Sequence, residues 1–175
     1  MFSASVPVTA QAFCNRAQER ERIRQAIAQL RSGAPRWLCV VGPRKVGKTS
    51  LLLEVARELT AAAEVAGAVG FVGVDVLDSM PVSQEFFRAL ALQTLDVTWS
   101  SEAGTSLRAL ARDPAAYRSA LAGVAAFAAL PAELRSFLLE LPVLPAADAG
   151  FVRACLELPE QLASGVGRHL VVAID

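Results

Sequence analysis

The segment from Arg36 to Leu53, RWLCVVGPRKVGKTSLLL, constrains the fold more strongly than any other stretch of the chain. It contains the pattern G-x-x-x-x-G-K-T at residues 42–49, which wraps backbone amides around a phosphate group. The apolar run at 37–41 predicts a buried parallel strand just before this loop. Apolar residues at helical spacing follow Thr49 and predict a helix just after it. We therefore expect the order strand, glycine loop, helix.

Each fixed position of the glycine loop has a chemical reason. Gly42 and Gly47 permit positive φ and let the backbone approach a phosphate with no Cβ in the way. The loop amides and the positive end of the following helix then face the β-phosphate. Lys48 reaches the β- and γ-phosphate oxygens of ATP, and the Thr49 hydroxyl is a ligand for Mg²⁺. The predicted nucleotide-binding residues are Gly42, Pro43, Arg44, Lys45, Val46, Gly47, Lys48, Thr49 and Ser50.

The helix expected after the loop is amphipathic. Its apolar stripe consists of Leu51, Leu52, Val55 and Leu59. Its opposite face carries Glu54, Arg57 and Glu58. This pattern predicts that the apolar stripe packs on a core while the charged side chains lie in solvent.

Composition and charge exclude several classes of function. A chain of 175 residues is long enough for one domain with a substantial core. Lys plus Arg and Asp plus Glu number 17 each, so bulk charge gives no direct evidence for nucleic acid as a partner. The uncharged stretch 119–132 is too short to span a bilayer, and the first 13 residues do not resemble a signal peptide. Cys14, Cys39 and Cys155 are far apart in sequence, and we interpret them as reduced thiols of a cytoplasmic protein.

Residues 13–34 form the expected N-terminal helix segment, with Asn15 as a good N-cap residue. The arrangement F-x-N-R-x-x-E runs from Phe13 to Glu19, ahead of the glycine loop. In many P-loop ATPases such a segment packs beside the adenine, so Phe13, Asn15 and Arg16 are candidates for the adenine side of a site. A solvated helix start explains Arg16 and Glu19 equally well, and both interpretations stay open.

A second strand and a helical region follow. The run VGFVGVDV at 69–76 predicts another buried strand. Asp75 and Asp78 can contact a metal or an attacking water, although a strand end followed by a helix cap is the commoner explanation. We expect residues 97–163 to be a helical insertion, because short helical patches there are broken by prolines. We find no catalytic cluster in that sequence.

The last segment, HLVVAID at 169–175, is an apolar strand that ends in an aspartate. Downstream of a complete glycine loop, this is the form of a Walker B strand, which delivers a carboxylate to the Mg²⁺ shell. Thr49 and Asp175 are therefore the predicted metal residues, and Lys48 and Asp175 the predicted catalytic residues. His169 is interpreted as a residue at the start of the strand and not as a catalytic base.

With these motifs in hand, the chain resembles the archaeal-type P-loop ATPases of the STAND group, the signal-transduction ATPases with numerous domains, close to the origin-recognition-type AAA+ proteins. The matching pieces are FCNR…E at 13–19, GPRKVGKTSLL at 42–52, VDVLD at 74–78 and LELPEQLA…HLVVAID at 156–175. The resemblance implies an ATP-binding domain with Mg²⁺, whose ATPase cycle switches a larger regulatory or signalling protein between two states. It also implies partners among further domains of such a protein.

The resemblance implies further motifs that the printed sequence does not contain. In that family a catalytic glutamate follows the Walker B aspartate, a later strand carries a polar sensor residue, and a helical domain closes over the nucleotide. We therefore expect residues 1–175 to be the N-terminal part of a single P-loop ATPase domain, with little turnover by itself. The family's sheet places another strand between 37–41 and 169–174, so we expect these two strands to lie about twice 4.8 Å apart. We expect the strand at 69–76 to pair with 169–174.

The expected fold class is α/β: a three-layer α/β/α P-loop NTPase with an incomplete parallel sheet of about three strands, plus the helical insertion. The expected parts are 13–34, a strand, loop, helix and second strand at 36–96, the insertion at 97–163, and the Walker B strand at 169–175. Two alternatives stay open: a small-molecule kinase or other P-loop phosphotransferase, and an interaction module that holds nucleotide without hydrolysis. A direct ladder between 37–41 and 169–174 would favour the kinase.

Overall fold

The structure, a computed structural model, describes residues 7, 9–10, 13, 16–35, 38–43, 46–61, 68–74, 84–145 and 149–174. The chain divides into two compact units, one up to Val69 and the other from Gly70 to Ile174. The helices and strands, in order, are α1 (Ala17–Arg31), α2 (Lys48–Ala61), β1 (Val69–Val74), α4 (Gln84–Ala103), α5 (Leu107–Leu110), α6 (Pro114–Ala122), α7 (Ala125–Ala128), α8 (Ala132–Glu140), α9 (Ala149–Val166) and β2 (His169–Ile174).

The first unit is built on the contact between α1 and α2. The buried residues of the apolar stripe of α1 are Ile23 and Ile27. Those of α2 are Leu51 and Val55, and both of these are 1% exposed. Ion pairs from α1 also reach α2, since Arg20 and Arg24 both pair with the Glu58 carboxylate. Burial of two facing apolar stripes is the main stabilising term in such a helix pair, and the burial of Leu51 and Val55 confirms that the apolar stripe predicted for the helix after the loop packs on a core.

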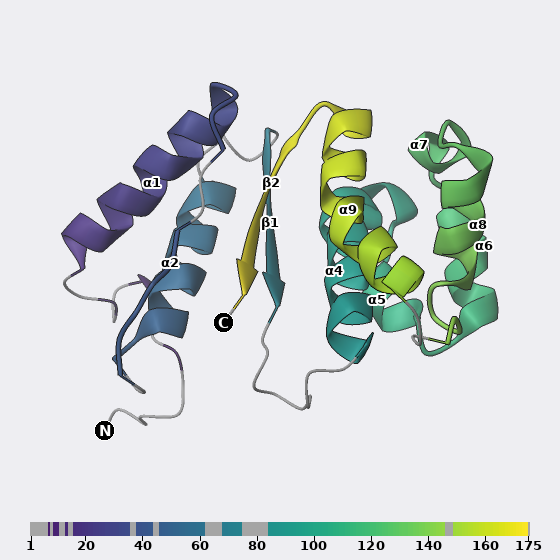
Figure 1. Cartoon of the computed structure of the whole chain (residues 1–175), viewed down its shortest axis with the longest axis horizontal. Coiled ribbons are helices and arrows are strands. Elements are labelled where there is room, and N and C mark those ends of the chain that lie inside the picture. Colours follow the sequence, from purple (N-terminus) through teal and green to yellow (C-terminus); the bar gives the residue numbers. More distant parts are fainter. Residues whose placement is uncertain are drawn as a thin grey trace. The chain divides into compact units, whose positions relative to one another are not determined.

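The second unit contains a two-stranded sheet in which β1 is hydrogen-bonded to β2. The two strands run parallel (Figure 1). Val72 and Val74 of β1 pack with Leu90 of α4, so this helix covers the sheet. Gly70 makes the close packing possible, because a Cβ there would lie 2.6 Å from Cδ2 of Leu170 and 2.8 Å from Cγ1 of Val97. The predicted pairing of 69–76 with 169–174 is therefore confirmed for the described residues 69–74.

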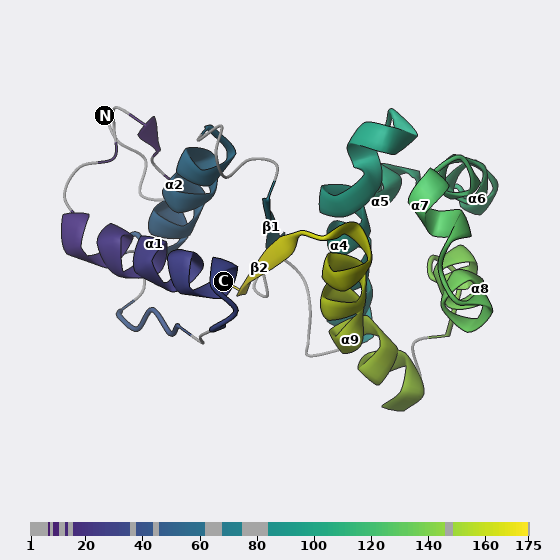
Figure 2. The ribbon, with the colours of Figure 1, turned by 90° about the horizontal axis from the view of Figure 1, so that it is seen from above.

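The helices of the second unit enclose a separate apolar core. Helices α4 and α9 lie side by side (Figure 2), and α5 to α8 complete the cluster. Its fully buried large side chains are Leu95, Trp99, Leu107, Tyr117, Leu121, Leu138, Leu141, Leu158 and Leu162. Pro159 lies inside α9, which continues on both sides of it from Ala149 to Val166. Helix α4 also runs unbroken across residue 97, where we had expected the insertion to begin.

Two details of the strands differ from the prediction. Residues 38–41, the described part of the strand expected at 37–41, form no strand, and the side chains of Leu38 and Val41 are 51% and 88% exposed. A strand needs a neighbour for its backbone hydrogen bonds, and the sheet of the described residues contains only β1 and β2. In β2 the expected burial is also incomplete, because Val172 is 39% and Ile174 is 53% exposed.

The architecture is an α/β fold with an incomplete parallel sheet and many helices, as predicted. The expected spacing between 37–41 and 169–174 stays a prediction, because these segments belong to different units. Among the described helices, none has both the length and the apolar character that crossing a bilayer requires.

Tyr117 gives a test of the helical core. Its side chain is fully buried, and its hydroxyl donates a hydrogen bond of 3.0 Å to the Leu138 carbonyl oxygen. The Tyr117→Phe variant leaves that oxygen with a 3.4 Å bond from the Leu141 amide, so we expect a loss of about 1 kcal/mol in the free energy of unfolding. Urea denaturation measures it, with Ser119→Ala on the exposed face of α6 as the control. Equal losses in the two variants would contradict this role of the hydroxyl.

Candidate functional site

The glycine loop leads directly into α2, as the motif requires. Gly47 has φ +84°, a conformation that side-chain-bearing residues rarely adopt, and its carbonyl oxygen accepts the first bond of the helix from the Leu51 amide at 3.0 Å. A Cβ on Gly42 would lie 3.1 Å from Cγ2 of Val46. Gly47 therefore adopts a conformation that favours glycine, and Gly42 lies close to the Val46 side chain.

Lys48 is the first residue of α2, and its side chain turns back over the loop. Its Nζ donates hydrogen bonds of 3.0 Å to the carbonyl oxygens of Gly42 and Pro43. The ammonium is thus held inside the curve of the loop by the backbone that a phosphate would approach. This arrangement fits a polyphosphate, because oxygens of the ligand can replace the two carbonyl oxygens as acceptors for the same ammonium.

Thr49 and Ser50 lie on the first turn of α2, next to Lys48. Ser50 is buried and Thr49 is half-buried. Their amides belong to the end of the helix that carries the positive partial charge, which favours an anion there. Arg44 and Lys45, which we also predicted in the nucleotide-binding set, lie outside the described residues.

The segment ahead of α1 contacts the glycine loop through Arg16. This residue is the N-cap of α1, with φ +67° and no side-chain cap hydrogen bond, so the N-cap predicted at Asn15 is one position too early. Its guanidinium donates to the Val46 carbonyl oxygen at 2.6 Å and to Glu19 Oε1 at 3.1 Å. A hydrogen bond from its own backbone and the Arg16 guanidinium lower the pKa of Glu19.

Of the other residues predicted on the adenine side, Phe13 lies against Arg20, whose Cζ is 5.8 Å from the centre of the ring. Asn15 is outside the described residues. The role of Phe13, Asn15 and Arg16 beside an adenine stays a prediction. A fully solvated helix start does not describe Arg16, because its guanidinium is fixed on the loop backbone.

Glu54, expected on the solvent face of α2, is buried, with 3% of its side chain exposed. Its carboxylate accepts hydrogen bonds from Nη2 and Nε of Arg57 at 2.6 and 3.0 Å and from the Ala10 amide at 2.7 Å. These donors, Arg57 first, lower the pKa of Glu54 to about 2. Periodicity misplaced Glu54 because its third donor, Ala10, lies 44 residues earlier in the chain.

Asp175, the predicted Walker B carboxylate, lies outside the described residues, while its strand β2 forms as expected and starts at His169. Within the described part of the chain, no three His, Cys, Asp or Glu side chains gather as a metal-binding cluster. Mg²⁺ at a nucleotide site keeps several waters and takes only one or two protein ligands. A threonine hydroxyl and one carboxylate are therefore a sufficient donor set in chemical terms.

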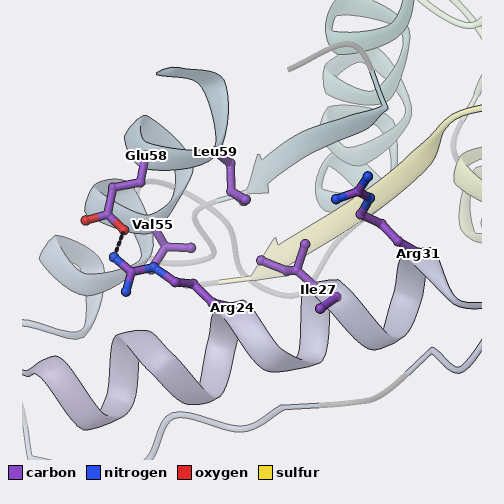
Figure 3. A pocket seen from close by; sticks show the side chains of 7 residues that line it. Arg24, Ile27, Arg31, Val55, Glu58 and Leu59 are labelled. Atoms are coloured by element: carbon purple, nitrogen blue, oxygen red, sulfur yellow. Dashed lines mark hydrogen bonds and ion pairs between the residues drawn. The ribbon is translucent and has the colours of Figure 1, made fainter. Parts of the chain in front are cut away.

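A groove of about 260 Å³ lies elsewhere in the first unit, between α1 and α2 (Figure 3). Its wall combines the apolar side chains of Ile27, Val55 and Leu59 with the Arg24–Glu58 ion pair, whose Nη2–Oε2 distance is 2.7 Å. Of the described loop residues 42–43 and 46–50, none lines it. The groove is therefore separate from the candidate phosphate site.

A glycine loop that opens a helix, with a lysine held in its curve, defines a P-loop nucleotide-binding protein. The family model of the AAA ATPase domain matches residues 12–175, and the chain belongs to this family. Membership implies the use of a nucleotide, with ATP binding and hydrolysis as the family's activity. The comparisons with curated proteins and with solved structures gave no significant match.

The lowered pKa of Glu54 gives a pH test. A carboxylate whose folded pKa is about 2, below its ordinary 4.5, stabilises the fold fully above pH 4.5 and loses that effect as the pH falls toward 2. The Glu54→Gln variant should be less stable than the wild type at pH 7, and the difference should narrow between pH 4.5 and 2.5. Denaturation at several pH values measures this. The control is Glu21→Gln, an exposed carboxylate of α1. A difference that does not change with pH would contradict the assignment.

Proposed function

We propose that residues 1–175 belong to one P-loop ATPase domain that binds Mg·ATP through residues 42–50. The family membership supports this proposal. The observation that carries it is the position of Lys48, whose Nζ lies 3.0 Å from the Gly42 and Pro43 carbonyl oxygens inside the glycine loop. A lysine fixed in the curve of its own loop places a positive charge where the β- and γ-phosphates of ATP bind.

In this proposal the chain binds the nucleotide mainly through its backbone and one ammonium. The Gly47 conformation allows successive amides of the loop to face the β-phosphate. Lys48 exchanges its two carbonyl acceptors for phosphate oxygens and so neutralises charge on the transferred phosphate. We assign Lys48 and Asp175 as the catalytic residues, with the Asp175 carboxylate orienting the metal shell.

Mg²⁺ would be held by the Thr49 hydroxyl and by Asp175, directly or through water. When bound, the ion would withdraw charge from the phosphates of the nucleotide. Thr49 follows Lys48 on the first turn of α2, so its placement is fixed by the same helix start that fixes the lysine. The nucleotide phosphates complete the coordination.

We further propose that ATP binding and hydrolysis switch a larger regulatory or signalling protein between two states, as in the STAND and origin-recognition-like groups. The resemblance of FCNR…E at 13–19 to the segment that precedes the loop in those groups supports this. So does the contact between that segment and the loop, the 2.6 Å bond from Arg16 to Val46. A contact that joins the loop to another element can transmit the state of the nucleotide.

The two alternatives make different demands on the same loop. A small-molecule kinase would join 37–41 directly to the Walker B strand, whereas the family to which the chain belongs is that of the AAA ATPase domain. An interaction module that holds nucleotide without hydrolysis has no need for both the lysine and the hydroxyl of Lys48 and Thr49. The ATPase is therefore our conclusion, in accord with the family.

Lys48→Ala tests the binding site. Because the ammonium is the charged side chain that the motif places on the β- and γ-phosphates, its loss should weaken ATP binding at least about tenfold. Titration of wild type and variant with a fluorescent ATP analogue measures this. Arg31→Ala, on the exposed end of α1, is the matched control for loss of a cation. Equal affinity of Lys48→Ala and the wild type would remove the site assignment.

Thr49→Ala and Asp175→Ala test the metal assignment. A metal ligand contributes mainly through the ion, so each variant should lose most of the gain in affinity that Mg²⁺ gives and keep most of its affinity in EDTA. Titrations of the ATP analogue with Mg²⁺ and with EDTA separate the two quantities. Ser119→Ala, far along the chain on α6, is the control. If Asp175→Ala kept the full effect of Mg²⁺, the Walker B assignment would be wrong.

A further inference from the structure

Arg16 adopts a backbone conformation that side-chain-bearing residues seldom use. Its φ of +67° and ψ of +25° place it in the left-handed region, at the N-cap of α1. Such a conformation costs free energy and persists only where surrounding contacts hold it. The Arg16 carbonyl oxygen accepts a hydrogen bond of 3.0 Å from the Arg20 amide, and the guanidinium joins the start of α1 to the glycine loop.

The guanidinium has a defined orientation. Glu19, one turn into α1, binds Nη1 at 3.1 Å, and the planar fork of the group then directs Nη2 to the Val46 carbonyl oxygen at 2.6 Å. A hydrogen bond from a charged donor is shorter and stronger than a neutral one. Val46 is thus the loop residue whose carbonyl group is fixed from outside the loop.

The direction of this carbonyl group decides the direction of an amide. The Val46–Gly47 peptide bond is trans, so the Val46 C=O and the Gly47 N–H point to opposite sides of one planar unit. Because Arg16 holds the carbonyl oxygen on its own side, the Gly47 N–H is directed away from Arg16. Gly47, with φ +84°, has the freedom to rotate that peptide plane if nothing holds it.

We propose that Arg16 is a positioning residue for the phosphate site, acting through the Val46–Gly47 peptide plane to aim the Gly47 amide at the β-phosphate. The inference rests on the proposed function and deepens it. It assigns to Arg16 neither contact with the adenine nor contact with the phosphate. Glu19 contributes to this positioning indirectly, because its carboxylate fixes the Arg16 guanidinium.

The main variant is Arg16→Asn, since asparagine tolerates the left-handed conformation and lacks the guanidinium. Its matched control is Arg24→Ala, which removes another arginine of α1 that binds α2, through Glu58 at 2.7 Å, without reaching the loop. Two probes compete with a fluorescent ATP analogue: ADP, and inorganic pyrophosphate, which has no adenine. Arg16→Asn should weaken both probes by the same factor, about tenfold, and Arg24→Ala should weaken neither.

Three outcomes of the titrations overturn the inference. A loss for ADP with unchanged pyrophosphate affinity means that Arg16 contacts the adenine. An equal loss in Arg24→Ala means that the whole helix pair has loosened. Unchanged affinity of Arg16→Asn for both probes means that the contact has no role in binding. Failure of the proposed function gives a different result. Either the wild type binds neither probe, or Lys48→Ala binds each probe with the same affinity as the wild type.

A spectroscopic readout separates positioning from direct phosphate contact. In protein labelled with ¹⁵N-glycine, the Gly47 amide signal should move when saturating pyrophosphate binds the wild type and Arg24→Ala. In Arg16→Asn the shift at saturation should be clearly smaller, because the amide is no longer aimed, and Arg16→Lys should restore part of it by keeping one charged donor. A full shift of Gly47 in saturated Arg16→Asn would overturn the proposal, since the amide would then be aimed at the phosphate without Arg16.

Discussion

The buried Glu54 carboxylate is the interaction on which the first unit depends. A carboxylate that is 3% exposed is tolerated only with donors at hand, and it obtains them from Arg57 and from the Ala10 amide. The Ala10 amide thereby joins a residue that precedes α1 to the helix that follows the glycine loop. Arg16 likewise reaches Val46 of the loop. The loop, its helix and the segment ahead of α1 thus form one connected group.

Much of the fold follows from local pattern. The strand at 69–74, the helix that follows the glycine loop and the helical character of the insertion were predictable, because strand and helix periodicity is a property of neighbouring residues. The pairing of 69–74 with 169–174 was predicted from the resemblance to a known family and not from periodicity. The glycine motif was predictable for a similar reason. Gly47 adopts the positive φ that its place in the motif requires.

The contacts that sequence reasoning missed join residues far apart in the chain. Glu54 was assigned to solvent because periodicity cannot show a partner 44 residues away, and the bond from Arg16 to Val46 spans 30 residues. The prediction of a strand at 37–41 was wrong at residues 38–41 for a related reason. Apolar character favours a strand, but only a paired neighbour makes one. Helix starts were also off by a residue, since Arg16 and not Asn15 is the N-cap.

The carbonyl bonds of Lys48 have a consequence for selectivity among anions. With its ammonium already bound to the Gly42 and Pro43 oxygens at 3.0 Å, the loop without ligand does not present a bare cation to solvent. An incoming anion must compete with two backbone acceptors at once. Chloride or a single orthophosphate offers too little charge and too few oxygens to replace both and also engage the loop amides, whereas a di- or triphosphate offers several. If the loop binds nucleotide as proposed, these two hydrogen bonds of Lys48 would make it select di- and triphosphates over smaller anions.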